Sequence, residues 1–173
     1  SVTTSRIAED ADYEGVRATF QGYLGTARLP MQVDLGFSDV VTPQPVEIEY
    51  PTVLNMPAPR LRAYNRETAI AEKFEAMVKI GELNSRMKDF FDIWALSSTG
   101  AFDGPALYES VKRTFERRGT AMDTSEVCFA EAFGQSGAKA AQWTAFVRRG
   151  DLKGAPATFA DAWSAVMAFL KPV

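Results

Sequence analysis

Residues 67–98, ETAIAEKFEAMVKIGELNSRMKDFFDIWALSS, decide the fold of this chain, because their apolar residues recur with the period of two consecutive helices. A short turn over 81–85 separates the two periodic segments. Glu75 and Lys79 are four residues apart on the opposite side of the first helix, where we expect an ordinary solvent-side pair. The residues on the two apolar faces are Ile70, Phe74, Met77 and Val78, then Met87, Phe90, Phe91 and Trp94.

Four charged residues in this helical hairpin are candidates for a site: Lys73, Lys88, Asp89 and Asp92. In one interpretation Lys88 and Asp92 form a helix-surface pair worth about 0.2–0.5 kcal/mol, and Lys73 is a surface lysine with a covered stem. In the other, a lysine and one or two carboxylates converge on a phosphate-bearing substrate or its metal. Lys73 projects at the shoulder of the apolar face, which favours the second interpretation, but spacing alone leaves both open.

Composition narrows the chemistry that 173 residues of this kind can perform. The absence of histidine excludes Ser-His-Asp and Cys-His catalysis and His-ligated zinc. A net charge of −3 argues against broad, nonspecific nucleic-acid binding. The single cysteine, Cys128, excludes an internal disulfide, and we expect a buried structural thiol and a reducing, cytoplasmic location. No segment has the roughly 20 apolar residues of a membrane span, and no signal peptide is visible.

The N-terminal part of the chain predicts a β-hairpin. Alternating residues over 16–21 and again over 29–36 have the period of half-buried strands, and 22–26 supplies the turn. Residues 1–14 are polar, and we expect a loop there. Asp34 lies on the second strand, opposite its apolar face.

Aspartate is disfavoured in the middle of a strand, so Asp34 is open to two interpretations. It is either a solvent-facing residue on a one-sided sheet or a metal-binding or catalytic carboxylate on a rigid strand. In the second case, Gly36 would allow a substrate to approach the backbone.

Two further short strands are expected over 46–50 and 60–64. Arg60, Arg62 and Arg66 follow one another at alternate or nearby positions. Either they form a basic rim that binds phosphates, or their charges keep an edge strand from pairing with another chain.

The rest of the chain is predicted to be helical, over 104–118, 125–133, 137–149 and from Thr158 to before Pro172. Asp103 and the Thr158–Asp161 pair supply N-terminal caps. The first of these helices ends in basic residues followed by Gly119, which suits the helix dipole and a left-handed cap, although an RNA contact is the alternative. Those basic residues are Lys112, Arg113, Arg117 and Arg118. The aromatic residues Trp143, Phe146, Trp163 and Phe169 are expected to pack in a core rather than stack on bases.

Several segments carry a resemblance to a known family: 13–43 (YEGVRATFQGYLGTARLPMQVDLGFSDVVTP), 49–54 (EYPTVL), 66–96 (RETAIAEKFEAMVKIGELNSRMKDFFDIWAL) and 114–120 (TFERRGT). Together they resemble the AbiEii/AbiGii toxin family of nucleotidyltransferases, related to polymerase-β-type enzymes. The resemblance implies an α+β fold: a small, mainly antiparallel sheet followed by a helical bundle. We expect 1–66 to be a β-rich partial nucleotidyltransferase core and 67–173 to be a helical part packed on it, as one compact unit.

The resemblance also implies roles for individual residues. Asp34 would bind Mg²⁺ or act as a catalytic carboxylate, Lys73 would hold the phosphates of a nucleoside triphosphate, and Asp89 or Asp92 would position Lys73 or the metal. Together with Lys73, the residues expected to bind substrate are Lys88, Arg62 and Arg113. The nucleotide acceptor would be an RNA, such as tRNA, or a protein, and a cognate antitoxin is the expected partner.

One part of the family pattern is absent from these residues. The glycine-serine turn and the Asp-x-Asp strand that open the family's core are not found, and GYLG (22–25) and GTAR (25–28) do not replace them. We therefore expect 1–173 to correspond to the C-terminal two-thirds of such a protein, which alone would not assemble a two-metal site. Two alternatives remain open at this point: a non-catalytic module that docks an antitoxin or another protein, and an architectural remnant whose charged residues are merely paired.

Overall fold

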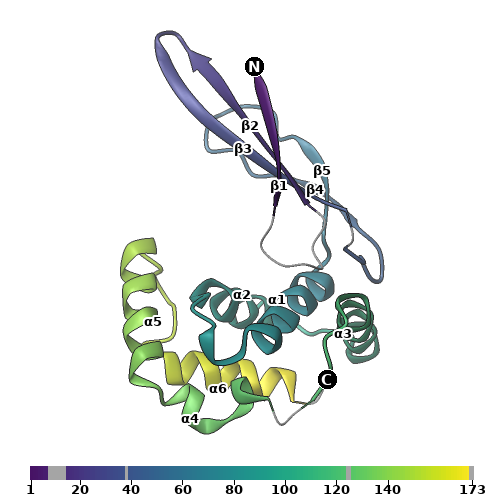
Figure 1. The fold of residues 1–173 in the computed structure, drawn as a ribbon, viewed down its shortest axis with the longest axis vertical. Helices are drawn as coiled ribbons and strands as arrows, with labels where there is room; N and C mark the ends of the chain where they lie inside the picture. The colour runs from purple at the N-terminus through teal and green to yellow at the C-terminus, as the bar shows by residue number, and fades with distance from the viewer. Residues whose placement is uncertain (8–14, 38, 124–125, 172–173) are drawn as a thin grey trace. The chain divides into compact units, whose positions relative to one another are not determined.

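The computed structural model describes residues 1–7, 15–37, 39–123 and 126–171 (Figure 1). The strands precede residue 64 and the helices follow residue 65, so the predicted α+β class is confirmed. The chain divides into two compact units, Ser1–Val40 and Val41–Val173. The predicted packing of residues 67–173 on residues 1–66 stays a prediction.

The first unit is an antiparallel sheet in the order β1–β2–β3. Its strands are β1 (Val2–Ile7), β2 (Gly15–Leu24) and β3 (Ala27–Gly36). The predicted hairpin of β2 and β3 is confirmed, with Gly25 at φ 59° in its turn, a conformation that glycine adopts without strain.

The prediction of a loop at the start of the chain was wrong for the part that forms β1. The sequence of β1, VTTSRI, has no apolar alternation, so its own pattern does not mark it as a strand. It is a strand because its backbone pairs with β2 from Val2↔Phe20 to Ile7↔Gly15. Thr3 and Thr19 reinforce this pairing through their hydroxyl groups, 2.7 Å apart. Residues 8–14 of the predicted loop lie outside the described residues.

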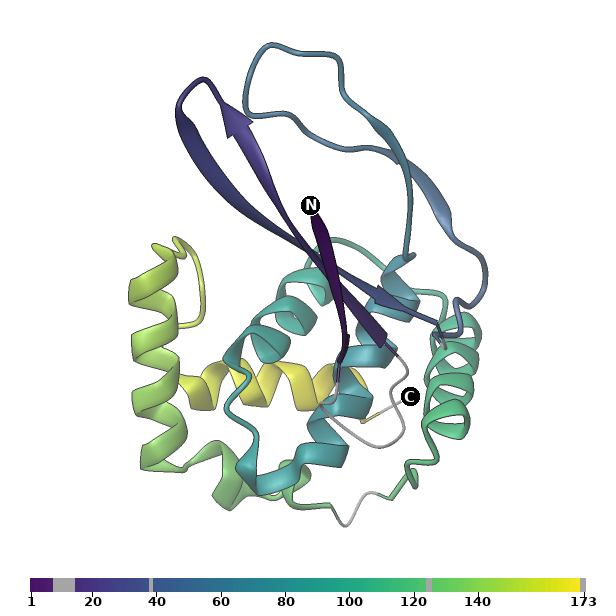
Figure 2. The ribbon, with the colours of Figure 1, turned by 45° about the horizontal axis from the view of Figure 1, so that its top comes forward.

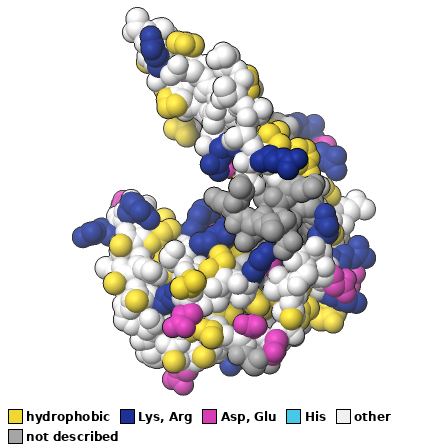
Figure 3. Space-filling model, in the orientation of Figure 1, with side chains coloured by type: hydrophobic (Ala, Val, Ile, Leu, Met, Phe, Trp, Pro, Cys, Tyr) yellow, Lys and Arg dark blue, Asp and Glu magenta, His cyan; other side chains and the backbone are white. Residues whose placement is uncertain are grey.

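The two faces of this sheet differ in polarity. The apolar residues of β3 alternate along the strand and are between 45 % and 49 % exposed: Leu29, Met31, Val33 and Leu35. Gln32 and Asp34 alternate with them and therefore lie on the opposite face. Hydrophobic side chains are correspondingly visible at the surface of the strands in Figure 3.

The second unit begins with a two-stranded antiparallel ribbon, β4 (Val46–Glu49) and β5 (Arg60–Ala63). Both strands had been predicted. Arg60 donates to Glu47 at 3.0 Å, and Glu47 is also the residue opposite Arg62 in the ladder. One ion pair, between Arg60 and Glu47, thus links the two strands.

The helices of the second unit are α1 (Arg66–Ile80), α2 (Met87–Ser97), α3 (Gly104–Arg118), α4 (Glu131–Gly134), α5 (Gly137–Gly150) and α6 (Phe159–Leu170). Two 3₁₀ turns join them, η1 (Gly81–Leu83) and η2 (Val127–Phe129). Helix α6 passes beneath α1 and α2, with α5 near one end and α3 on the other side (Figures 1 and 2). None of the helices in the described part of the chain is long and apolar enough to cross a membrane.

Side-chain caps set several of these helix ends. Asn65 accepts the N–H of Thr68 at 2.7 Å, and Asp103 accepts that of Ala106 at 3.0 Å. The predicted capping box at the start of α6 is present in both of its hydrogen bonds. Gly119 ends α3 in the left-handed conformation at φ 63°, as predicted.

The helix predicted over 125–133 was wrong as a single element. The structure has the short turn η2 and the four-residue helix α4 instead, joined by Ala130 in an extended conformation (φ −72°, ψ 137°). Cys128, in η2, is buried, and its carbonyl oxygen accepts the indole N–H of Trp163 at 2.8 Å. Residues 124–125 lie outside the described residues.

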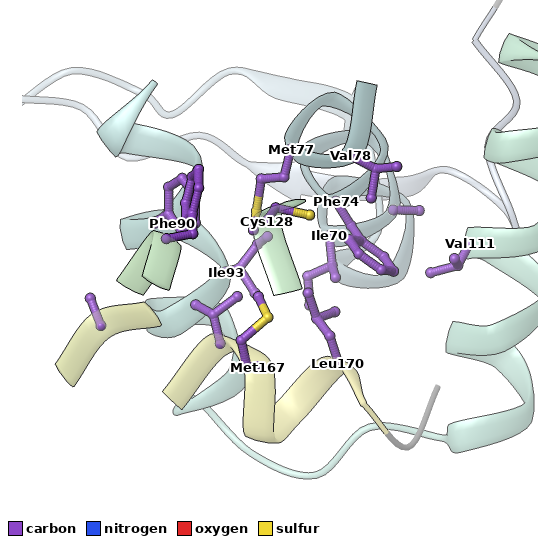
Figure 4. Packing of buried hydrophobic residues seen from close by; sticks show 14 of the residues in the cluster. Ile70, Phe74, Met77, Val78, Phe90, Ile93, Val111, Cys128, Met167 and Leu170 are labelled. Atoms are coloured by element: carbon purple, nitrogen blue, oxygen red, sulfur yellow. The ribbon is translucent and has the colours of Figure 1, made fainter. Parts of the chain in front are cut away.

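The hydrophobic core of the second unit lies where α1, α2, α3 and α6 meet (Figure 4). Ile70 and Phe74 reach it from α1, and Phe90 and Ile93 from α2. Met167 reaches it from α6 (Figure 4). The aromatic residues predicted to pack do so: Trp143 is 1 % exposed, and the remaining ones pack against the cluster. Those remaining ones are Phe146, Trp163 and Phe169.

The predicted helix faces needed two corrections. Glu75, expected on the solvent side, is 2 % exposed, and Thr120 donates to it at 2.5 Å, because α3 covers a second side of α1. On α2, Ile93 is buried, whereas Phe91 and Trp94 are only partly so. The reason is that α2 packs against α1, α5 and α6 rather than along a single seam.

Gly134→Ala is expected to destabilise the second unit by about 1–3 kcal/mol, because a methyl group there overpacks the core. A Cβ at Gly134 would lie 2.4 Å from Cε3 of Trp163, well inside van der Waals contact. Gly137→Ala is the matched control, since nothing lies within 4 Å of the corresponding position. Urea unfolding followed by tryptophan fluorescence should separate the two variants; equal midpoints would contradict the overpacking argument.

Candidate active site

Lys73 of α1 contacts two carboxylates of α2. Its Nζ lies 2.8 Å from Oδ2 of Asp92 and 3.4 Å from Oδ1 of Asp89. The three residues come together because α1 and α2 pack side by side as a helical hairpin. Lys73 and the two aspartates therefore lie together in the fold, while their role toward a substrate stays a prediction.

Two more cations complete the group. Nε of Arg86, the residue that precedes α2, lies 3.0 Å from Oδ2 of Asp89, and Lys88 pairs with Asp92 one helical turn along α2. We call these residues the Lys–Asp cluster: Lys73, Arg86, Lys88, Asp89 and Asp92. With three cations and two carboxylates, its net charge is +1.

The cluster is neither fully buried nor freely solvated. The side chains of Lys73 and Asp92 are 23 % and 20 % exposed, and that of Asp89 only 6 %. Burial opposes ionisation of Asp92, but hydrogen bonds from Lys73 and Lys88 outweigh it and hold its pKa below the ordinary value of 3.8. A lysine held in this way presents a positioned positive charge of the kind that binds phosphate oxygens.

The neighbour of Lys73 fixes α1 from its other side. Glu72 forms an ion pair with Arg118 of α3 at 2.5 Å, and both side chains are largely buried. The Glu72–Lys73 dipeptide thus ties α1 to α3 through one residue and to α2 through the next. Both ties limit movement of Lys73 relative to the core.

Asp34 lies in the first unit, on β3. Arg17 of β2 donates to both of its carboxylate oxygens at 2.9 Å, and Gln32 donates to them at 3.2 Å. The hydrogen bonds from Arg17 lower the pKa of this exposed carboxyl below its ordinary value. Because the Lys–Asp cluster belongs to the second unit, the predicted meeting of Asp34 with Lys73 stays a prediction.

The other basic residues predicted to bind substrate lie on other elements. Arg62 is on β5, opposite Glu47. Arg113 is on α3 and pairs with Glu109 one turn away at 2.6 Å. Arg66, from the same proposed rim as Arg62, stacks over the Phe102 ring at 4.4 Å and holds the loop after α2 through Ala101.

Arg86 is the residue of the cluster that sequence reasoning missed. Its signal was present, because it stands three residues before Asp89 at the start of a predicted helix, a spacing that brings side chains together. Cys128, by contrast, carries no site: burial raises the pKa of its thiol to about 11, so it is protonated at neutral pH.

A magnesium ion needs several oxygen ligands held close together. Within residues 1–7, 15–37, 39–123 and 126–171, no group of three or more Asp, Glu, His or Cys side chains is arranged to hold a metal ion. Asp34 contributes a single carboxylate, and that carboxylate is bound to a guanidinium. The described residues therefore do not form a complete Mg²⁺ site by themselves.

A sheet hairpin joined to a helical bundle with a lysine–carboxylate cluster defines a small α+β protein with a candidate phosphate-binding centre. Comparison with protein families gives a match to the model for "Nucleotidyl transferase AbiEii toxin, Type IV TA system" over residues 1–167. The chain belongs to this family of nucleotidyltransferase toxins, and membership in a toxin–antitoxin system implies a cognate antitoxin. No curated protein and no solved structure gives a significant match.

Proposed function

We propose that this chain contributes the phosphate-binding part of a nucleotidyltransferase that moves a nucleotide from a nucleoside triphosphate to an RNA, such as tRNA, or to a protein acceptor. The observation that carries the proposal is the contact of Lys73 with Asp89 and Asp92 in a chain of this toxin family. Such a reaction depends on positioning and charge stabilisation around the phosphates rather than on a protein nucleophile. A chain without histidine can meet that requirement.

In this proposal Lys73 binds the phosphates and the two aspartates orient it. Asp92 accepts from Lys73 at 2.8 Å, which holds the ammonium in place before substrate arrives. Lys88 is largely exposed and is able to turn from Asp92 to an incoming phosphate. The net positive charge of the cluster attracts the triphosphate.

We also propose that this reaction uses Mg²⁺. Mg²⁺ would neutralise the triphosphate and activate the attacking hydroxyl group when bound. Asp34 is the candidate ligand among the described residues, and its pair with Arg17 would have to open. NMR of the Arg17 and Asp34 side chains during Mg²⁺ titration tests this; unchanged signals up to millimolar concentrations of the ion would remove Asp34 from the site.

Lys73→Met is expected to weaken binding of MgATP or another Mg²⁺-bound nucleoside triphosphate by about tenfold to a hundredfold. A hydrogen bond to a charged group contributes about 1.5–3 kcal/mol, and 1.4 kcal/mol corresponds to a factor of ten. Isothermal titration calorimetry on the full chain with each of the four triphosphates provides the measurement.

Lys79→Met on the same helix is the control, because it removes an equal charge outside the Lys–Asp cluster. Equal affinity of the Lys73 and Lys79 variants would contradict the proposed role of Lys73. If no triphosphate binds the chain at all, the nucleotidyltransferase proposal fails for these residues.

The second candidate function is a protein-docking module for the antitoxin or another partner. It is supported by the exposed apolar row of β3, of which Met31 is 49 % and Val33 45 % exposed. Natural proteins cover such rows or use them for binding. Replacing Met31 and Val33 by glutamate should abolish antitoxin binding under this proposal and leave triphosphate binding unchanged, so the two functions are separable.

A further inference from the structure

A buried lysine on α5 holds the turn between the two helices that carry the Lys–Asp cluster. Lys139 is 6 % exposed, and its ammonium donates to the carbonyl oxygens of Glu82 at 2.7 Å and of Asn84 at 2.5 Å. The ammonium also lies 4.9 Å from the centre of the Phe133 ring. Burying a charge is unfavourable unless it is hydrogen-bonded, and here two backbone carbonyl groups of the turn accept hydrogen bonds from the ammonium.

The position of the two carbonyl groups explains why a cation lies there. They belong to residues 82 and 84, in the connection between the end of α1 and the start of α2. The carbonyl groups at the end of a helix or 3₁₀ turn lack partners within it and carry partial negative charge. The 3₁₀ turn η1 has no basic side chain of its own, and Lys139 supplies a positive charge to it from another helix.

From this turn, polar contacts continue into the cluster. Asn84 is fully buried, and its Oδ1 accepts the backbone N–H of Arg86 at 2.8 Å. The side chain of Arg86 reaches Asp89 at 3.0 Å, and Asp89 contacts Lys73 at 3.4 Å. The series therefore runs from α5 through the turn to the start of α2, and ends at the lysine of α1.

We propose that Lys139 is a positioning residue for the Lys–Asp cluster. By holding the turn, it fixes the axial position of α2 relative to α1 and so keeps Asp89 and Asp92 opposite Lys73. The consequence for a phosphate-bearing substrate rests on the proposed function. The competing explanation is that Lys139 only anchors α5 to the rest of the unit.

A double-mutant cycle in the full chain distinguishes these explanations. The coupling free energy between Lys73 and Asp92 is obtained from the free energies of unfolding of Lys73→Met, Asp92→Asn and the double variant. The cycle is measured first in the wild-type background and then in the Lys139→Met background. Lys139→Met keeps an unbranched stem and removes the hydrogen-bond donors. The coupling is expected to fall by at least half in that background, whereas an unchanged coupling would overturn the proposal.

Trp143→Phe is the matched control on the same helix. It removes the indole N–H that donates to Pro156 at 3.0 Å and leaves the contacts of the turn in place. This variant is expected to lower stability without changing the Lys73–Asp92 coupling. An equal loss of coupling in the Lys139→Met and Trp143→Phe backgrounds would show general loosening of α5 and would also overturn the proposal.

A second variant covers the case in which Lys139→Met does not fold. Asn84→Ala removes the acceptor for Arg86 and retains the carbonyl group that Lys139 contacts. It interrupts the same series of contacts, so the coupling should again fall by at least half. A full coupling in Asn84→Ala would exclude the turn as the route from Lys139 to the cluster.

Binding of MgATP to the same variants separates this inference from the proposed function. Where the wild-type chain binds MgATP, Lys139→Met should weaken binding several-fold and Trp143→Phe should not. A wild-type chain that binds no MgATP would contradict the proposed function, while the coupling measurement would still decide the positioning role of Lys139.

Discussion

Phe90→Ala is expected to lower the free energy of unfolding of the second unit by about 3–5 kcal/mol, the usual effect of emptying a fully buried phenylalanine site. Phe90 is 0 % exposed, and its ring lies 5.0 Å from that of Phe159 in an edge-on arrangement and 6.0 Å from that of Phe133. It therefore joins α2 to α4 and α6. Stability of small domains is about 5–15 kcal/mol, so the loss is a large fraction of the total.

Urea unfolding followed by tryptophan fluorescence measures this effect in the second unit, because the three tryptophans of the chain all lie there. Phe91→Ala is the control: it removes the same side chain from the next position, where the ring is only partly buried against Trp94 and Phe146. The expected cost is clearly smaller. If both variants unfold at the same urea concentration, Phe90 is not the centre of this packing.

Local signals were sufficient to predict most of the helical part. A capping aspartate, an early proline and a terminal glycine define α3 between Asp103 and Gly119, and the structure has those bounds. The box formed by Thr158 and Asp161 likewise begins α6. These features depend on residues three or four apart, which a sequence shows directly.

Features that depend on distant partners were not predictable in the same way. The first strand exists because it pairs with β2, and Glu75 is buried because α3 covers it. Neither fact is visible in the polarity of the residues concerned. The break at Ala130 follows the packing of Trp163 against Gly134 and Cys128 rather than a local breaker.

The candidate site also combines contacts that are local in sequence with contacts between distant residues. Periodicity placed Lys88 and Asp92 one turn apart on α2, and their pair is present. The contacts of Lys73 depend on how α1 packs against α2. The position of Lys73 at the shoulder of the apolar face and the family resemblance favoured them, while spacing alone left them open. Lys139 was not identified, because its partners are backbone carbonyl groups 55 and 57 residues earlier in the chain.

Lys73→Met is expected to destabilise the second unit by about 2–3 kcal/mol at neutral pH, since it leaves two carboxylates without their shared cation. Removing one partner of a fully buried ion pair costs about 3–5 kcal/mol, and the lower value reflects the partial exposure of Lys73 and Asp92. Asp92→Asn in the same chain should recover part of the loss, because it removes a partly buried carboxylate that has lost one of its two cations.

The loss of stability in Lys73→Met is expected to depend on pH. In the wild-type chain the pKa of Asp92 is held below 3.8, so its contribution to stability is present above that pH and is lost as the pH falls through the lower folded-state value. Without Lys73 the main cation that lowers this pKa is gone, and Asp92 takes up a proton at a higher pH. The stability difference between wild type and Lys73→Met should therefore shrink as the pH is lowered from neutral to below 3.8. Urea unfolding at several pH values measures it, and a difference that stays constant over this range would show that Lys73 and Asp92 are not electrostatically coupled.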